Sequence, residues 1–76
     1  MNETLKTALV KYANQDLAIA RTKGNMGIVG TKGGATYISY DKSTKIYGIR
    51  NGSSVFEVNQ DEAVQIVISL YNVVED

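Results

Sequence analysis

The sequence predicts an α+β fold, with an N-terminal helix, a four- or five-stranded antiparallel β-meander and a C-terminal apolar helix packed on one sheet face. Three observations lead to this prediction. Apolar residues recur at helical spacing near the start, turn-forming dipeptides recur through the middle, and a long apolar run lies near the end. With 76 residues, the chain is expected to form a single domain over residues 1–76.

The first predicted element is a helix that Asn2 or Thr4 can cap. Its apolar stripe keeps three- and four-residue spacing and consists of Leu5, Ala8, Leu9, Tyr12 and Ala13. Two ends fit the pattern. We prefer an end in the polar run 14–16, which makes residues 17–23 a first strand. In the alternative, Leu17 and Ala20 continue the stripe and the helix runs to about Thr22.

Turn signals divide the middle of the chain into strands. Residues that tolerate positive φ, as two-residue hairpins require, occur at Gly24-Asn25, Gly33-Gly34 and Asn51-Gly52, and residues 41–44 form a further turn. The strands between them begin every nine residues, near residues 17, 26, 35, 44 and 53. Gly24-Asn25 is the weakest of these signals, and it decides between four strands and five.

The glycine-rich stretch 24–34 is better explained by hairpins than by a phosphate-binding loop. Lys32 is followed by Gly33, where a Walker loop has Ser or Thr, and no helical pattern comes next. Gly27 and Gly30 therefore read as strand residues, at which glycine permits close backbone approach or a bulge.

The last predicted element is a helix that Asn59 can cap, with Asp61 and Glu62 in its first turn. Its only polar stripe is narrow, so the helix needs cover on more than one side. That cover is either the sheet and the first helix, or a second subunit. We expect a homo-oligomer, as a dimer, whose interface comprises Val64, Val67, Ile68, Leu70, Tyr71 and Val74.

Two-residue hairpins fix which strand residues share a face. The predicted register pairs Tyr47 with Phe56, Ile38 with Tyr47, and Val29 with Ile38. The core face then carries mainly Ala18, Ala20, Val29, Ile38, Tyr40, Tyr47, Ile49, Phe56 and Val58. The opposite face carries Leu17, Ile19, Arg21, Lys23, Met26, Ile28, Lys32, Ala35, Tyr37, Ser39, Ile46, Arg50, Ser53, Val55 and Glu57.

This second face is the candidate binding surface, because it mixes apolar and basic side chains. Its predicted binding residues are Arg21, Lys23, Lys32, Tyr37, Ile46, Arg50 and Val55. The eight basic and eight acidic residues of the chain balance, but every base lies in residues 1–50 and five of the acids follow residue 50. An anionic partner is thus compatible with a net charge of zero.

Composition argues against catalysis. Histidine and cysteine are absent, so the usual general base, the thiol nucleophile, the disulfide and the commonest metal ligands are missing. We expect no enzyme activity, no cofactor and no metal. The chain begins without a signal-peptide pattern and has no apolar run long enough to span a bilayer, which predicts a cytoplasmic protein that does not insert into membranes.

The predicted function is therefore binding. The first hypothesis is a small protein-interaction module, a regulator or inhibitor of the kind that mobile elements encode, which binds itself and another protein. The alternative is a nucleic-acid-binding protein that uses its basic, tyrosine-bearing sheet face to stack bases and neutralise phosphates.

Overall fold

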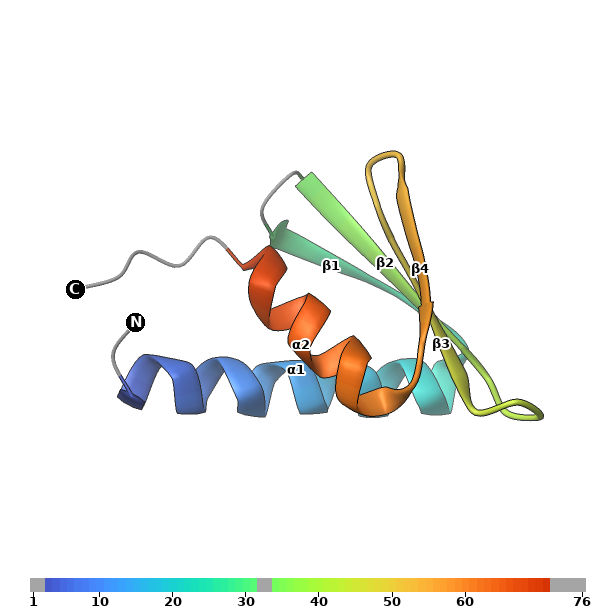
Figure 1. Ribbon diagram of the computed structural model, residues 1–76, viewed down its shortest axis with the longest axis horizontal. Helices are drawn as coiled ribbons and strands as arrows, with labels where there is room; N and C mark the ends of the chain where they lie inside the picture. Colours follow the sequence, from blue (N-terminus) through green and yellow to red (C-terminus); the bar gives the residue numbers. More distant parts are fainter. Residues whose placement is uncertain (1–2, 32–33, 72–76) are drawn as a thin grey trace.

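A computed structural model describes residues 3–31 and 34–71, without the side chains of residues 29–31. The elements are α1 (Glu3–Lys23), β1 (Asn25–Thr31), β2 (Gly34–Asp41), β3 (Ile46–Asn51), β4 (Ser54–Val58) and α2 (Gln60–Leu70). The strands form one antiparallel meander in the order β1-β2-β3-β4. Helices α1 and α2 cross on one side of this sheet (Figure 1). The predicted α+β fold is confirmed, with four strands.

Helix α1 is longer than the preferred prediction, and the predicted strand over residues 17–23 is wrong. Leu17 and Ala20 continue the buried stripe that Leu9 and Ala13 begin. Burial of this stripe outweighs the polar run 14–16, whose residues do not interrupt the helical spacing. The helix ends at Gly24, which has φ +90° and donates its N–H to the Ala20 carbonyl at 2.7 Å. Gly24 is thus a helix C-cap and not a hairpin residue.

Strands β2, β3 and β4 keep the predicted faces, although the pairs differ. Tyr47 pairs with Tyr40 in β2 and with Val58 in β4. The predicted partners were Ile38 and Phe56, so each pairing is displaced by two residues. Side chains alternate with a period of two, so a shift of two leaves every side chain on its expected face. The β3–β4 loop is Gly52-Ser53, one residue beyond the predicted turn, and Gly52 has φ +61° as the first residue of a type II′ turn requires.

The faces of β1 are reversed relative to the prediction. Met26 pairs with Ile38, and the β1–β2 register shifts between Ile28 and Thr31. This shift sets two residues of β1 against one of β2, which is the geometry of a β-bulge. One extra residue in β1 moves the side chains that precede the bulge to the opposite face of the sheet. Ile28 is consequently buried and Met26 packs against the core, where the prediction placed both on the open face.

The core lies between the sheet and the two helices. From the sheet come the fully buried Ile38 and Ile49, and from α2 the fully buried Val67. Tyr47 is also buried, and its hydroxyl has no hydrogen-bond partner in the described part of the chain. Burial raises the pKa of this hydroxyl above its ordinary value.

Helix α2 begins as predicted at Asn59, whose side-chain oxygen accepts a hydrogen bond from the Glu62 N–H at 2.9 Å. The helix packs on α1 and β3. Just beyond its end, the Tyr71 hydroxyl donates a hydrogen bond of 2.9 Å to the Asp16 carboxylate in α1. Partial burial and this hydrogen bond raise the pKa of Tyr71 to about 12.

The raised pKa of Tyr71 predicts a loss of stability at alkaline pH. In the unfolded chain Tyr71 ionises near its ordinary pKa of about 10, whereas the folded protein keeps the proton until pH reaches about 12. The free energy of unfolding should therefore hold below pH 10 and fall as pH rises through this interval. Urea denaturation at several pH values should show a shallower decline for Tyr71→Phe than for the native chain. Parallel declines would contradict the shift.

Candidate open sheet face

Side chains on the face of the sheet away from the helices fall into three rows across the strands. The register gives these rows as Gly27–Tyr37–Arg50–Val55, Asn25–Ser39–Gly48–Glu57 and Asp41–Ile46. No described element packs on this face. We call it the open face.

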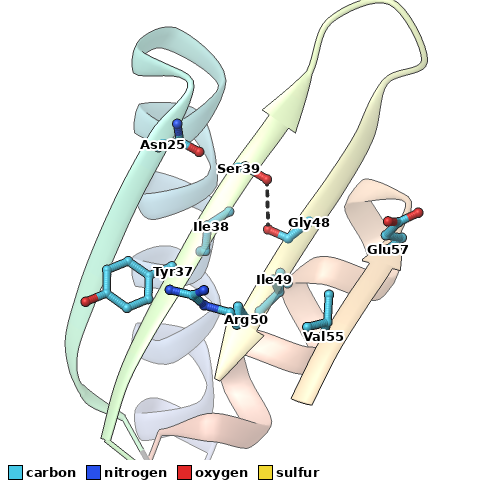
Figure 2. Close-up of a pocket in the computed structure, with 9 residues that line it drawn as sticks. All are labelled: Asn25, Tyr37, Ile38, Ser39, Gly48, Ile49, Arg50, Val55 and Glu57. Atoms are coloured by element: carbon cyan, nitrogen blue, oxygen red, sulfur yellow. Dashed lines mark hydrogen bonds between the residues drawn. The ribbon is translucent and has the colours of Figure 1, made fainter. Parts of the chain in front are cut away.

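The open face is hollowed along its middle row, because that row has small residues at its centre. Ser39 donates a long hydrogen bond of 3.4 Å to the Gly48 carbonyl and forms the floor with it. Figure 2 shows this pair, with Tyr37, Arg50 and Val55 standing along one side. The hollow has a volume of about 380 Å³. A second hollow of about 330 Å³ shares the same floor and extends toward Ile46.

Gly48 keeps this floor low. A Cβ atom at position 48 would lie 2.7 Å from the Ser39 hydroxyl oxygen, well inside normal contact. Any larger residue would push Ser39 aside and raise the floor toward the level of the flanking side chains.

The flanking row is apolar with a cation in it. Tyr37 is 52% exposed and Val55 is 66% exposed, high values for large hydrophobic residues. The Arg50 guanidinium lies 5.1 Å from the centre of the Tyr37 ring, which is a cation–π arrangement. On the other side of the hollow, Ile46 is 37% exposed.

The structure brings together four of the seven predicted binding residues, namely Tyr37, Ile46, Arg50 and Val55. Arg21 and Lys23 instead lie in the last turn of α1, so their predicted place on the sheet is wrong. Arg21 lines a separate hollow with Lys45 and the start of α2. Lys32 lies outside the described residues.

Relocation of these bases changes the charge of the open face. Its described charged residues are Arg50, Glu57 and, at its end, Asp41. A face predicted to be basic is thus mixed in sign over the part of the chain that is described.

The predicted interface residues on α2 divide into two groups. Val64 and Val67 are buried inside one protomer, since α2 packs on α1 and β3. Ile68, Leu70 and Tyr71 are half-buried and pack against the same core, and Val74 lies outside the described residues. The apolar composition of α2 left two alternatives, cover by the same chain or cover by a second subunit. The contacts of α2 with α1 and β3 supply the first kind of cover.

Sequence reasoning missed Gly48, Asn25 and the exposure of Phe56. An isolated glycine inside a strand was a usable signal for Gly48, because such a glycine often marks close approach of another chain. Asn25 was assigned to a turn that does not exist. Phe56 has the predicted core-side orientation, yet it is 36% exposed because α2 packs on β3.

No group of three acidic, histidine or cysteine residues that could hold a metal ion is found in residues 3–31 and 34–71. Neither described helix combines the length and the hydrophobicity that a bilayer span requires. Comparison with protein-family models, with curated proteins and with solved structures finds no match to this chain. The function is therefore argued from these residues alone.

The assignment of faces predicts opposite outcomes for two neighbours in β3. Arg50→Ala removes an exposed side chain and one cation–π contact, and should lower the free energy of unfolding by no more than about 1 kcal/mol. Ile49→Ala should lower it by about 2–5 kcal/mol, because Ile49 is fully buried. Urea denaturation measures both. A larger loss for Arg50→Ala than for Ile49→Ala would show that the faces are reversed.

Proposed function

We propose that this protein is a small non-enzymatic protein-interaction module that binds its partner across the open face. The observation that supports this most directly is the exposure of Tyr37, Ile46 and Val55 around two adjoining hollows that share a glycine floor. Exposed apolar groups rimmed by polar ones are typical of protein-binding sites on small domains.

The chemistry of the face indicates the kind of partner. Protein interfaces combine an apolar centre, enriched in tyrosine and arginine, with a polar rim. Here Tyr37, Val55 and Ile46 supply the centre, while Arg50 and Glu57 supply charges of both signs. A partner that inserts an apolar side chain over Gly48 and presents an acidic group to Arg50 fits this arrangement.

Two exposed tyrosines provide a matched test. Tyr37 on the open face is 52% exposed, and Tyr12 on α1 is 58% exposed. In affinity capture from the source cells, a partner should be retained by the native chain and by Tyr12→Ala, and its recovery should fall at least tenfold with Tyr37→Ala. A loss of this size is about 1.4 kcal/mol, within the range for a buried aromatic anchor.

The capture experiment has two contradicting outcomes. A partner that is lost with Tyr12→Ala and kept with Tyr37→Ala would place the binding surface on α1. A partner that is kept by both variants and by Val55→Asp would remove the open face from the proposal.

Nucleic-acid binding is the second candidate, and the Tyr37–Arg50 stack is the observation in its favour, since an aromatic ring beside a cation can stack a base. The mixed charge of the described face weighs against it, because phosphate neutralisation requires clustered bases. We expect no change in fluorescence anisotropy when the protein is added to a labelled mixed-sequence oligonucleotide at low salt. Binding that weakens steeply as salt rises would favour this candidate over the first.

A further inference from the structure

We infer that two copies of this chain pair along β4, so that their sheets join into one. The inference rests on the proposed binding function and extends it, since a second copy becomes the first partner and sets two open faces side by side. Four features of β4 support it. These are its position at the edge of the sheet, its composition, its backbone N–H and C=O groups that point away from β3, and the way that two antiparallel copies of β4 match each other.

Strand β4 is a sheet edge that lacks several of the features that normally prevent edge pairing. No described strand lies on its outer side. Natural edges are protected by bulges, prolines, short length or charged residues, lysine above all. Residues Ser54–Val58 contain neither proline nor lysine, and the β3–β4 register has no shift. The opposite edge, β1, does have a bulge between Ile28 and Thr31.

The backbone of β4 has donors and acceptors directed away from β3. In the tight turn Gly52-Ser53 the flanking residues Asn51 and Ser54 are hydrogen-bonded. Hydrogen-bonded and non-hydrogen-bonded pairs alternate in an antiparallel ladder. The N–H and C=O groups of Phe56 therefore point toward β3, and those of Val55 and Glu57 point outward.

These outward groups match a second β4 related by a two-fold axis at Phe56. Val55 then lies opposite Glu57 of the other copy, and each such pair exchanges both N–H···O bonds. The competing register with the axis at Glu57 sets two carboxylates directly opposite each other, which is destabilising. The charge on β4 thus argues against the axis at Glu57.

The side chains support the same axis. Phe56 becomes a non-hydrogen-bonded pair with its own copy, the arrangement in which side chains are closest. It points to the helix side, where it is 36% exposed in one protomer. Pairing covers this ring. All four helices then lie on one side of the joined sheet, and the two open faces become continuous on the other.

The first test is the molar mass in solution. At tens of micromolar, light scattering after size exclusion should give twice the 8.3 kDa of one chain. Val55→Pro deletes an outward N–H that β3 does not use, and should halve the mass while the circular dichroism spectrum is retained. Tyr37→Ala should keep the double mass. A native chain with a measured mass of 8.3 kDa would overturn the pairing and leave the open-face proposal standing.

Cysteine scanning tests the axis without relying on Val55→Pro. The chain has no cysteine of its own, so single variants report one contact each. In the proposed pair the two Cα atoms of residue 56 lie about 4.5 Å apart. A disulfide can span this distance, so the thiols of two Phe56→Cys chains can be joined. Mild oxidation should cross-link Phe56→Cys and leave the exposed control Tyr12→Cys monomeric on a non-reducing gel. Cross-linking of Glu57→Cys in place of Phe56→Cys would overturn the proposed axis.

Discussion

Two helices that pack against each other cover only one face of a four-stranded sheet, and this limit determines the rest of the structure. The chain uses both helices on the side that contains Ile38 and Ile49, where they bury a continuous core. Nothing described remains to cover the other side. That side must therefore either present polar groups to water or serve as a binding surface. Its row of Tyr37, Arg50 and Val55 is more apolar than contact with water requires. The candidate site thus follows from the same limit as the core.

Sequence reasoning succeeded where a residue's neighbours along the chain decide its structure. The Asn59 cap, the strands over residues 34–58 and their faces depend on local turn chemistry and on a period of two, and all were predictable. Even a misplaced turn at Asn51-Gly52 left the faces intact, because the error moved the pairing by two residues. Tyr37, Ile46, Arg50 and Val55 were therefore predictable members of the open face.

Sequence reasoning failed where contacts between distant parts of the chain decide the local structure. The stripe through Leu17 and Ala20 supports either a strand or a longer helix in isolation, and packing of α1 on the sheet and α2 selects the helix. The bulge in β1 has no signal beyond its glycines, yet one extra residue reverses Met26 and Ile28. Arg21 and Lys23 lie in the last turn of α1 and not in a strand. The wrong strand prediction over residues 17–23 therefore also made the predicted open face too basic.

The hydrogen bond between Tyr71 and Asp16 joins residues that are 55 positions apart. The stripe of α1 is covered by β1 and β2, which follow it directly in the sequence, and by α2, which comes after the whole sheet. Contacts between segments far apart in the sequence close long loops, so the contact of α1 with α2 is slow to form compared with the local hairpins of the meander. The core is therefore complete only when the first and the last described helix meet, and the sheet that presents the open face depends on a contact that spans almost the whole described sequence.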